Sequence, residues 1–280
     1  MFKNLPKGDI GVALYILTAF MMLIIPVQPA VLDVLLAFDM ALSFIIMFRC
    51  MFAEEVLSMS FYPTVLLLTT IFRIALNVSS TRLILTTGDP GTVIKTFGNF
   101  VGGGNLIVGI IVFILLIIVQ FVVINKGSER VAEVTARFTL DAMPGKQMAI
   151  DADLNSGSIT DKEAMERRSK IQEEASFFGS MDGASKYVKG DATASLIITF
   201  VNIIGGIAMG VLQQGMSAAD AANKYTILTI GDGLVGQIPS LLISLSTGIL
   251  VTKGSKTADF GSVLIKQLFG VPKVLYFVGA

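Results

Sequence analysis

Charged side chains interrupt several long apolar stretches of this chain. Arg73 and Asp39 lie within such stretches, Asp191 lies at the start of another, and Asp232 lies just before the last one. A charged side chain in lipid costs about 2.5–3.5 kcal/mol on insertion scales, so it indicates a functional site such as an ion or proton path. The chain has no histidine, so carboxylates and lysines must carry any proton transfer. Asp33, on a different helical face from Asp39, is expected at the membrane interface.

Three of these stretches carry polar or small side chains three and four residues apart, which places each set on one helical face. Such faces are typical of helix-packing seams, and packing explains the serines, threonines and glycines. Packing does not require a charge, which favours a functional role for Arg73, Asp191 and Asp232. The three sets are Thr69, Arg73, Asn77 and Ser80; Asp191, Ser195, Thr199, Asn202, Gly206 and Gly210; and Gly233, Gln237, Ser240, Ser244 and Thr247.

The composition places these residues in a membrane. Of 280 residues, 53% are hydrophobic and only 15% are charged, whereas a soluble domain carries about 25% charged residues. Six apolar runs are long enough to cross a bilayer as helices, at about 10–27, 31–48, 61–78, 106–124, 192–212 and 234–251. The sequence therefore predicts an all-α polytopic membrane protein, a helical bundle.

Basic residues predict the orientation of these spans, because cytoplasmic loops carry the excess of lysine and arginine. Most of them fall on the cytoplasmic side if the N-terminus is cytoplasmic. We therefore expect spans one to four in 1–124, a small cytoplasmic loop domain in 125–190 and spans five and six in 191–252. A cytoplasmic segment and the start of a truncated seventh span, from Val274, are expected in 253–280.

Local signals predict structure in two of the connections. Thr160-Asp-Lys-Glu163 is a capping box, which predicts a helix from about 160 to Phe178 that stops at Gly179. The outer loop, 82–105, contains Gly88-Asp-Pro-Gly91 and is predicted to form turns.

Three motifs suggest catalysis or ligand binding, but the surrounding sequence or the residue positions do not fit each kind of site. Gly231-Asp-Gly-Leu-Val-Gly236 precedes an apolar span rather than opening a βαβ unit, so it predicts no dinucleotide site. Asp151–Gly157 resembles a calcium loop, but its glycine and its twelfth residue, Lys162, do not fit. An aspartyl protease needs carboxylates about 3 Å apart, whereas Asp191 and Asp232 are predicted near opposite ends of their spans. We therefore expect no enzyme, cofactor or metal site. Zero net charge predicts no nucleic-acid partner.

Four long stretches resemble the flagellar and type III secretion export-gate family, also called the FHIPEP family. They are RIALNVSSTRLIL from Arg73, FTLDAMPGKQMAIDADLN from Phe138, EEASFFGSMDGASKYVKGDA from Glu173 and TILTIGDGLVGQIPSLLIS from Thr226. The resemblance runs from about residue 8 to the end. The AIDADLN sequence is more similar to the flagellar branch of the family than to the virulence branch.

The resemblance implies a location and a set of partners. Members lie in the bacterial inner membrane and form a homo-oligomeric ring of nine subunits around other export-gate membrane subunits. They couple an ion-motive force to the export of unfolded proteins. Export ATPase complex, chaperones and substrates would bind through a C-terminal cytoplasmic domain that is absent from this sequence. Membrane lipid is the remaining expected partner.

The resemblance also implies four ion-relay residues, Arg82, Lys186, Asp191 and Asp232. Lys186 and Arg82 are the expected cations beside the two carboxylates, and protonation of Asp191 at the inner membrane face would alter its contacts with the 125–190 loop. Secondary members of the polar path are Arg73, Asn77, Asp39, Asn202 and Gln237. The alternatives are a passive ring scaffold, a virulence-type secretion homologue and an independent small-solute transporter.

Overall fold

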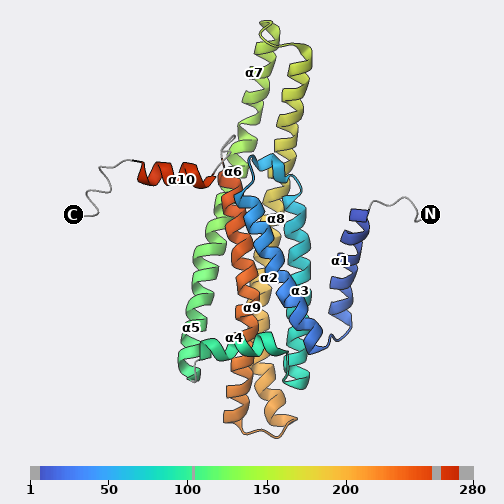
Figure 1. Ribbon diagram of the computed structural model, residues 1–280, viewed down its shortest axis with the longest axis vertical. Coiled ribbons are helices and arrows are strands. Elements are labelled where there is room, and N and C mark those ends of the chain that lie inside the picture. Colours follow the sequence, from blue (N-terminus) through green and yellow to red (C-terminus); the bar gives the residue numbers. More distant parts are fainter. Residues whose placement is uncertain (1–6, 103–104, 254–259, 271–280) are drawn as a thin grey trace, which may run out of the picture.

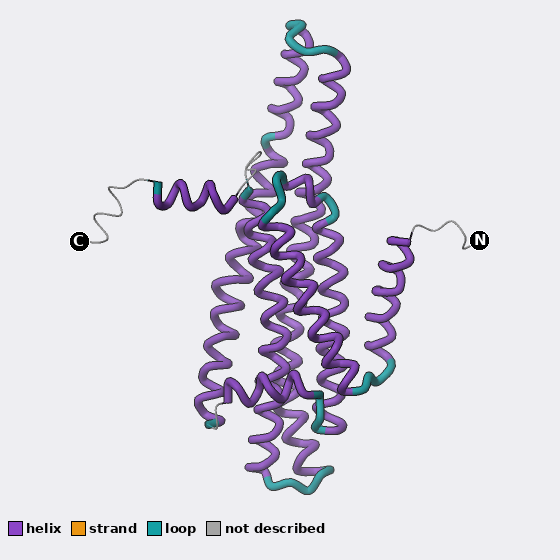
Figure 2. The backbone as a smooth tube through the Cα atoms, viewed as in Figure 1, coloured by secondary structure: helices purple, strands orange, loops and turns teal. Residues whose placement is uncertain are grey.

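The computed structural model describes residues 7–102, 105–253 and 260–270, and these residues form helices and connecting turns without β-strands. Figures 1 and 2 show a bundle of long helices that run along one axis. The helices are α1 Lys7–Ile24, α2 Pro29–Met51, η1 Val56–Met59, α3 Tyr62–Thr87, α4 Thr92–Gly102, α5 Leu106–Ile118, η2 Val119–Asn125, α6 Lys126–Asp141, α7 Met143–Asn155, α8 Asp161–Leu212, α9 Ala218–Thr252 and α10 Phe260–Phe269.

Five helical stretches of the described residues are long and apolar enough to cross a membrane. They are α2, η1 with α3, α5 through α7, α8 and α9, and α1 is a shorter apolar helix. The prediction of an all-α membrane protein with several spans is therefore confirmed. The expected seventh span, from Val274, lies outside the described residues.

Helix α8 is far longer than the sequence predicted. Its start is as expected, because the Thr160 hydroxyl accepts the Glu163 N–H at 3.3 Å and the Glu163 carboxylate accepts the Thr160 N–H at 2.8 Å. The predicted end near Phe178 is wrong, since the helix continues to Leu212 over 52 residues. Gly179 is not among the residues with positive φ, so it does not act as a stop signal. A glycine inside a helix costs only about 1 kcal/mol, which tertiary packing of the same helix readily offsets.

Part of the segment 125–190 belongs to the bundle itself. Ala132 and Ala136 of α6 are buried in one core cluster with Phe177 and Met181 of α8. Only α7 and the first turns of α8 project beyond the bundle, as a helical hairpin (Figure 2). The hairpin has a small core of its own, formed by Met143, Ile150, Ala164 and Ile171. The expected loop domain is therefore a projecting hairpin, which we call the α7–α8 hairpin.

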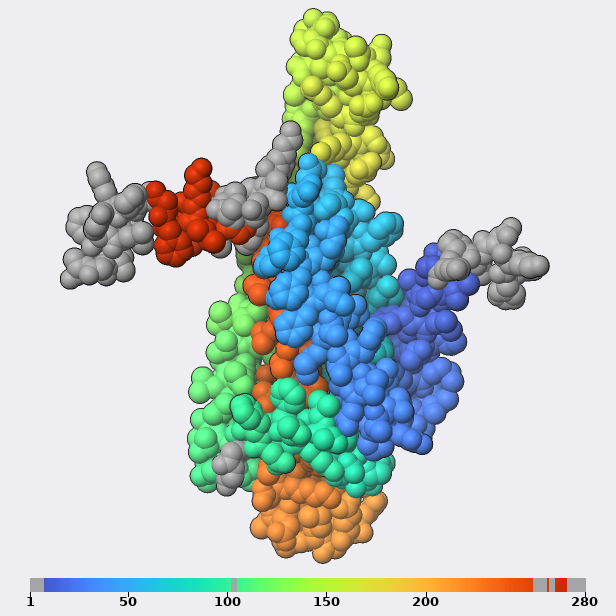
Figure 3. Space-filling model, in the orientation of Figure 1, coloured from blue at the N-terminus to red at the C-terminus, as the bar shows by residue number. Residues whose placement is uncertain are grey.

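The loop predicted as turns contains a helix. Gly88 and Gly91 do form turns, with φ of +63° and +110°. Helix α4 follows them and lies across α9 in the half of the bundle away from the α7–α8 hairpin, and the turn between α8 and α9 extends beyond it (Figure 3). Its apolar residues Ile94, Phe97 and Val101 are three and four residues apart, a helical pattern that the flanking glycines obscured.

Asp33 fixes the start of α4. Its two carboxylate oxygens accept the backbone N–H of Thr92 at 2.8 Å and of Val93 at 3.0 Å. These N–H groups belong to the first turn of α4, which has no partner for them within the helix. Asp33 therefore caps a helix that lies 59 residues further along the chain, a role beyond the expected interfacial position.

We expect Asp33→Ala to loosen α4 without unfolding the bundle. Loss of a capping carboxylate costs about 0.5–2 kcal/mol, so hydrogen exchange of the α4 amides should rise by roughly 2- to 30-fold. Lys95→Ala is the control, because Lys95 forms a solvated ion pair with Asp89 at 2.7 Å. The Lys95 ammonium holds the pKa of the Asp89 carboxyl below its ordinary value, but exposed pairs contribute little to stability. Equal exchange in the two variants would contradict the capping role.

Candidate functional site

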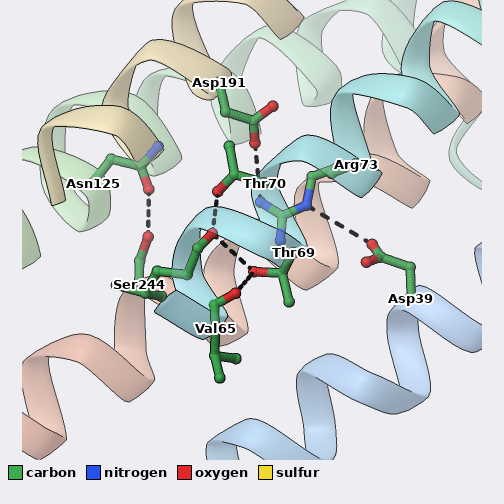
Figure 4. Close-up of polar contacts among 9 residues, drawn as sticks. Asp39, Val65, Thr69, Thr70, Arg73, Asn125, Asp191 and Ser244 are labelled. Carbon is green, nitrogen blue, oxygen red and sulfur yellow. Dashed lines mark hydrogen bonds and ion pairs between the residues drawn. The ribbon is translucent and has the colours of Figure 1, made fainter. Parts of the chain in front are cut away.

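Arg73 lies between two carboxylates from different helices. Its Nη1 atom is 3.0 Å from Oδ2 of Asp191 on α8, and its Nε atom is 3.8 Å from Oδ2 of Asp39 on α2 (Figure 4). Each of the three side chains is only 3% exposed. The three helices thus meet at a buried charge cluster, which we call the Arg73 cluster.

The Arg73 cluster lies deep in the bundle rather than at its inner end. Asp39 and Arg73 are near the middle of α2 and α3, and the ion pair places Asp191 at the same level. The predicted position of Asp191 at the inner membrane face, in contact with the 125–190 loop, is therefore wrong. Hydropathy underestimated its depth because the charge is paired with Arg73, and a paired charge can lie within a span.

A small polar cavity opens beside Arg73 and Asp191. Its volume is about 30 Å³, enough for at least one water molecule. Its polar lining includes side chains from α3, η2, α8 and α9, namely Arg73, Asn77, Gln120, Asp191, Ser195, Thr199, Gln237 and Ser240. Oδ1 of Asp191, Oδ1 of Asp39 and Nη2 of Arg73 are buried without a hydrogen-bond partner in the structure. These atoms leave the cluster able to bind a further polar group or ion.

The charges of the Arg73 cluster do not balance. Two carboxylates surround one guanidinium, so the fully ionised cluster carries one excess negative charge. An uncompensated charge is costly inside a protein, by several kcal/mol even after relaxation. Uptake of one proton or one monovalent cation would make the cluster neutral. The arrangement is therefore suited to binding and releasing a single positive charge.

Asp232 forms a second, separate buried site. It lies on α9, is 8% exposed and accepts a hydrogen bond from Nδ2 of Asn202 at 3.2 Å. Asn202 is 11 residues beyond Asp191 on α8, which corresponds to about 16 Å along the helix. Gly233, the neighbour of Asp232, lines the cavity of the Arg73 cluster. The two acidic sites thus lie along one polar seam, several turns apart.

The three polar faces predicted from the sequence do point into the bundle. Asn77 and Gln237 line the cavity, and Asn202 binds Asp232. Gly206 allows close packing, because a Cβ there would overlap the ring of Tyr225. All five secondary members of the expected polar path therefore contact one of the acidic sites or line the cavity.

The two expected cations lie elsewhere. Lys186 is exposed and pairs with Asp182 at 2.6 Å, because a residue five positions before Asp191 is about 140° around the helix. Arg82 donates to the carbonyl oxygens of Leu23 at 2.9 Å and Ile24 at 3.1 Å, at the end of α1. The prediction that these residues accompany the carboxylates is wrong. Arg73, predicted as secondary, is the cation of the site.

Sequence reasoning missed Gln120 and Asn125. Both lie in η2, a π-helical segment that follows α5 directly, and both face other spans. Two amides in an otherwise apolar run were the available signal. Their spacing of five residues does not fit one α-helical face, so the pattern did not stand out.

The chain is similar to curated proteins of flagellar and virulence systems. It is 54% identical over 272 residues to the flagellar biosynthesis protein FlhA of Bacillus subtilis and 51% identical over 270 residues to that of Salmonella typhimurium. It is 53% identical over 275 residues to the low calcium response locus protein D of Yersinia pestis. These alignments cover 95–98% of the chain and 39–40% of each relative. No solved structure matches the chain significantly.

A family model gives the assignment. The model of the FHIPEP family matches residues 19–280, which include every residue of the Arg73 cluster and Asp232. The similarity to FlhA proteins extends over the same region. The chain therefore belongs to the FHIPEP family.

Proposed function

We propose that this chain is the membrane part of a bacterial flagellar protein export component of the type III secretion kind. Its role is to couple the movement of an ion across the inner membrane to the export of unfolded proteins. Family membership and relatives named as flagellar biosynthesis proteins support the export role. The chain is almost equally identical to a flagellar and to a virulence relative, so overall identity does not distinguish the two branches. The AIDADLN sequence favours the flagellar branch.

The Arg73 cluster is the observation that carries the ion-coupling part of the proposal. A scaffold needs no buried cluster with one excess negative charge, whereas an ion carrier does. Cation uptake changes the charge at the point where α2, α3 and α8 meet. This supplies a two-state element that an ion gradient can bias. No enzymatic step is part of the proposal.

The topology proposed for the membrane has the α7–α8 hairpin in the cytoplasm, together with the N-terminus. The hairpin carries basic residues such as Lys146, Arg167 and Arg168, each in an ion pair, and cytoplasmic segments are rich in such residues. The start of α1 lies toward the same end of the bundle (Figure 1). Helix α4 then lies on the outer side.

The proposed partners are other copies of the chain and other export-gate membrane subunits. Several helices expose large apolar side chains, as Ile107, Ile111 and Leu115 do on α5. Such surfaces suit lipid or neighbouring subunits within a membrane. A homo-oligomeric ring, nine-membered by family resemblance, would use part of them. The export ATPase complex, chaperones and substrates complete the proposed set of partners.

The direct test compares Asp191→Asn with Asp191→Glu in the full-length protein. We expect asparagine to lower export of flagellar proteins at least about 100-fold, because it cannot exchange a cation, and glutamate to retain part of it. Asp182→Asn, at a partly exposed position of the same helix, is the matched control. Native gel electrophoresis would show whether the ring assembles. Near wild-type export by Asp191→Asn would refute the relay, and loss of assembly in that variant would favour the scaffold.

A further inference from the structure

A second polar cavity lies on the side of the Arg73 cluster that faces the α7–α8 hairpin. Its volume is also about 30 Å³, and its lining comes from α3, η2, α6, α8 and α9. The Oγ atom of Ser185 is buried there without a hydrogen-bond partner in the structure, on a residue that is 8% exposed. We call this cavity the vestibule. Its polar lining residues are Asn125, Ser128, Glu129, Ser185, Lys189, Ser244 and Thr247.

The vestibule and the cavity of the Arg73 cluster follow one another along the same elements. On α9, Ser240 lines the cavity of the Arg73 cluster and Ser244, one turn later, lines the vestibule. On η2, Gln120 lines the cavity of the Arg73 cluster and Asn125, which follows it, lines the vestibule. On both elements, the step from the cavity of the Arg73 cluster to the vestibule leads toward the hairpin end of the bundle. The two cavities are therefore successive steps of one polar seam.

A hydrogen bond marks the boundary between the two cavities. The Ser244 hydroxyl donates to Oδ1 of Asn125 at 3.0 Å, beside the Arg73 cluster (Figure 4). The carbonyl oxygen of Ser244 in turn accepts the Ser128 hydroxyl at 2.6 Å. A single neutral hydrogen bond contributes only about 0.5–1.5 kcal/mol, so it can open and close rapidly.

The π-helical winding of η2 is what brings Asn125 to this boundary. Residues five apart are hydrogen-bonded neighbours in a π-helix, so Gln120 and Asn125 share one face. In an α-helix the same two residues would lie about 140° apart, and one of them would face away from the seam. Segments of this kind are frequent at functional sites. A return to α-helix would remove Asn125 from the boundary.

The vestibule has a charged mouth. Lys189 and Glu129 form an ion pair at 3.1 Å, and their side chains are 57% and 22% exposed. Glu129 thus reaches from the surface into the cavity lining. A surface pair of this kind contributes little stability and exchanges readily with water. The vestibule therefore reaches the surface of the chain at this ion pair.

We propose that the vestibule is the route by which a hydrated monovalent cation, hydronium or sodium, passes between Asp191 and the hairpin end. The Asn125–Ser244 hydrogen bond is the gate on this route, and the π-helical segment positions it. This inference rests on the proposed function, since it connects the relay site to the cytoplasmic side, where an inward flow of ions leaves.

Silver ion tests the route without relying on export. Ag⁺ is a small monovalent cation that replaces the proton of a thiol and thereby blocks later alkylation. Ser185→Cys, Ser240→Cys and Ser246→Cys would be made in the full-length protein, in membrane vesicles of each orientation. Ser246 is 0% exposed and lines neither cavity, and buried Cys50 is the background. The readout is the rate at which Ag⁺ protects each thiol from N-ethylmaleimide added after denaturation.

We expect Ag⁺ added from the hairpin side to protect Ser185→Cys and Ser240→Cys at least tenfold faster than Ser246→Cys. Adding Asn125→Leu, which puts an apolar side chain of similar size in place of the polar amide, should slow protection of Ser240→Cys at least tenfold and leave Ser185→Cys unchanged. Val122→Leu, on an exposed position of η2, should change neither rate. Equal rates at Ser240→Cys with and without Asn125→Leu would refute the gate, and protection only from the opposite side would refute the route. Failure of the Asp191 variants to impair export would refute the relay while leaving these rates as they are.

Discussion

Arg73→Leu is expected to lower the amount of folded protein in the membrane several-fold. The substitution leaves Asp39 and Asp191 buried without their cation. Breaking a buried ion pair by removing one partner costs about 3–5 kcal/mol, and losses of this size change cellular abundance severalfold. Quantitative immunoblotting of membranes and thermal unfolding of the purified protein would measure the effect.

The fully neutral variant should behave differently. Asp39→Asn, Arg73→Gln and Asp191→Asn together remove the whole charge cluster, so no unpaired charge remains to be buried. We expect this triple variant to reach near wild-type abundance and to assemble, but to lose export. Arg137→Gln is the control for loss of a basic residue, since Arg137 is exposed. Wild-type export by the triple variant, or wild-type abundance of Arg73→Leu, would contradict the role given to the cluster.

Gly231→Ala is expected to displace α4 from α9. A Cβ atom at this position would overlap the carbonyl oxygen of Ile94 and lie 2.9 Å from the backbone nitrogen of Gly98. Both neighbours are backbone atoms, so no side chain can move aside. Overpacking costs typically about 1–3 kcal/mol, and rigid neighbours place this variant at or above the upper end. Thermal unfolding, with hydrogen exchange of α4, would show the loss.

Gly183→Ala is the matched control for this substitution. Gly183 is also inside a long helix, but apart from its own stretch of helical backbone no atom lies within 4 Å of a Cβ built there. Alanine is a better helix former than glycine by about 0.8–1.0 kcal/mol, so this variant should be slightly more stable than wild type. Equal stability of the two variants would contradict the close α4–α9 contact.

The inward faces of the spans could be predicted from the sequence. Polar residues at helical spacing cannot all face lipid, which is enough to predict that Asn77, Asn202 and Gln237 face other helices. The capping box at Thr160 likewise fixed the start of α8. Both inferences depend on residues close together in the chain, where spacing determines geometry.

Contacts between distant segments were beyond the same reasoning. The partner of Asp191 is Arg73, 118 residues away, and the sequence offered the nearby Lys186 instead. The depth of Asp191 in the bundle follows from that ion pair. A hydropathy profile treats each charge as unpaired, so it could not predict this depth. Asp33 and the start of α4 are likewise joined only by the fold. The π-helical winding of η2 breaks the spacing rule that would have revealed Asn125.

Ion flux through the reconstituted protein tests the central claim most directly. The full-length protein would be placed in liposomes, and proton and sodium uptake would be followed under an imposed gradient. Wild type and the control variant Asp182→Asn should conduct one of these ions, and Asp39→Asn with Asp191→Asn should lower that flux at least about tenfold. Equal flux in wild type and the doubly neutralised protein would contradict the claim that the Arg73 cluster carries the ion.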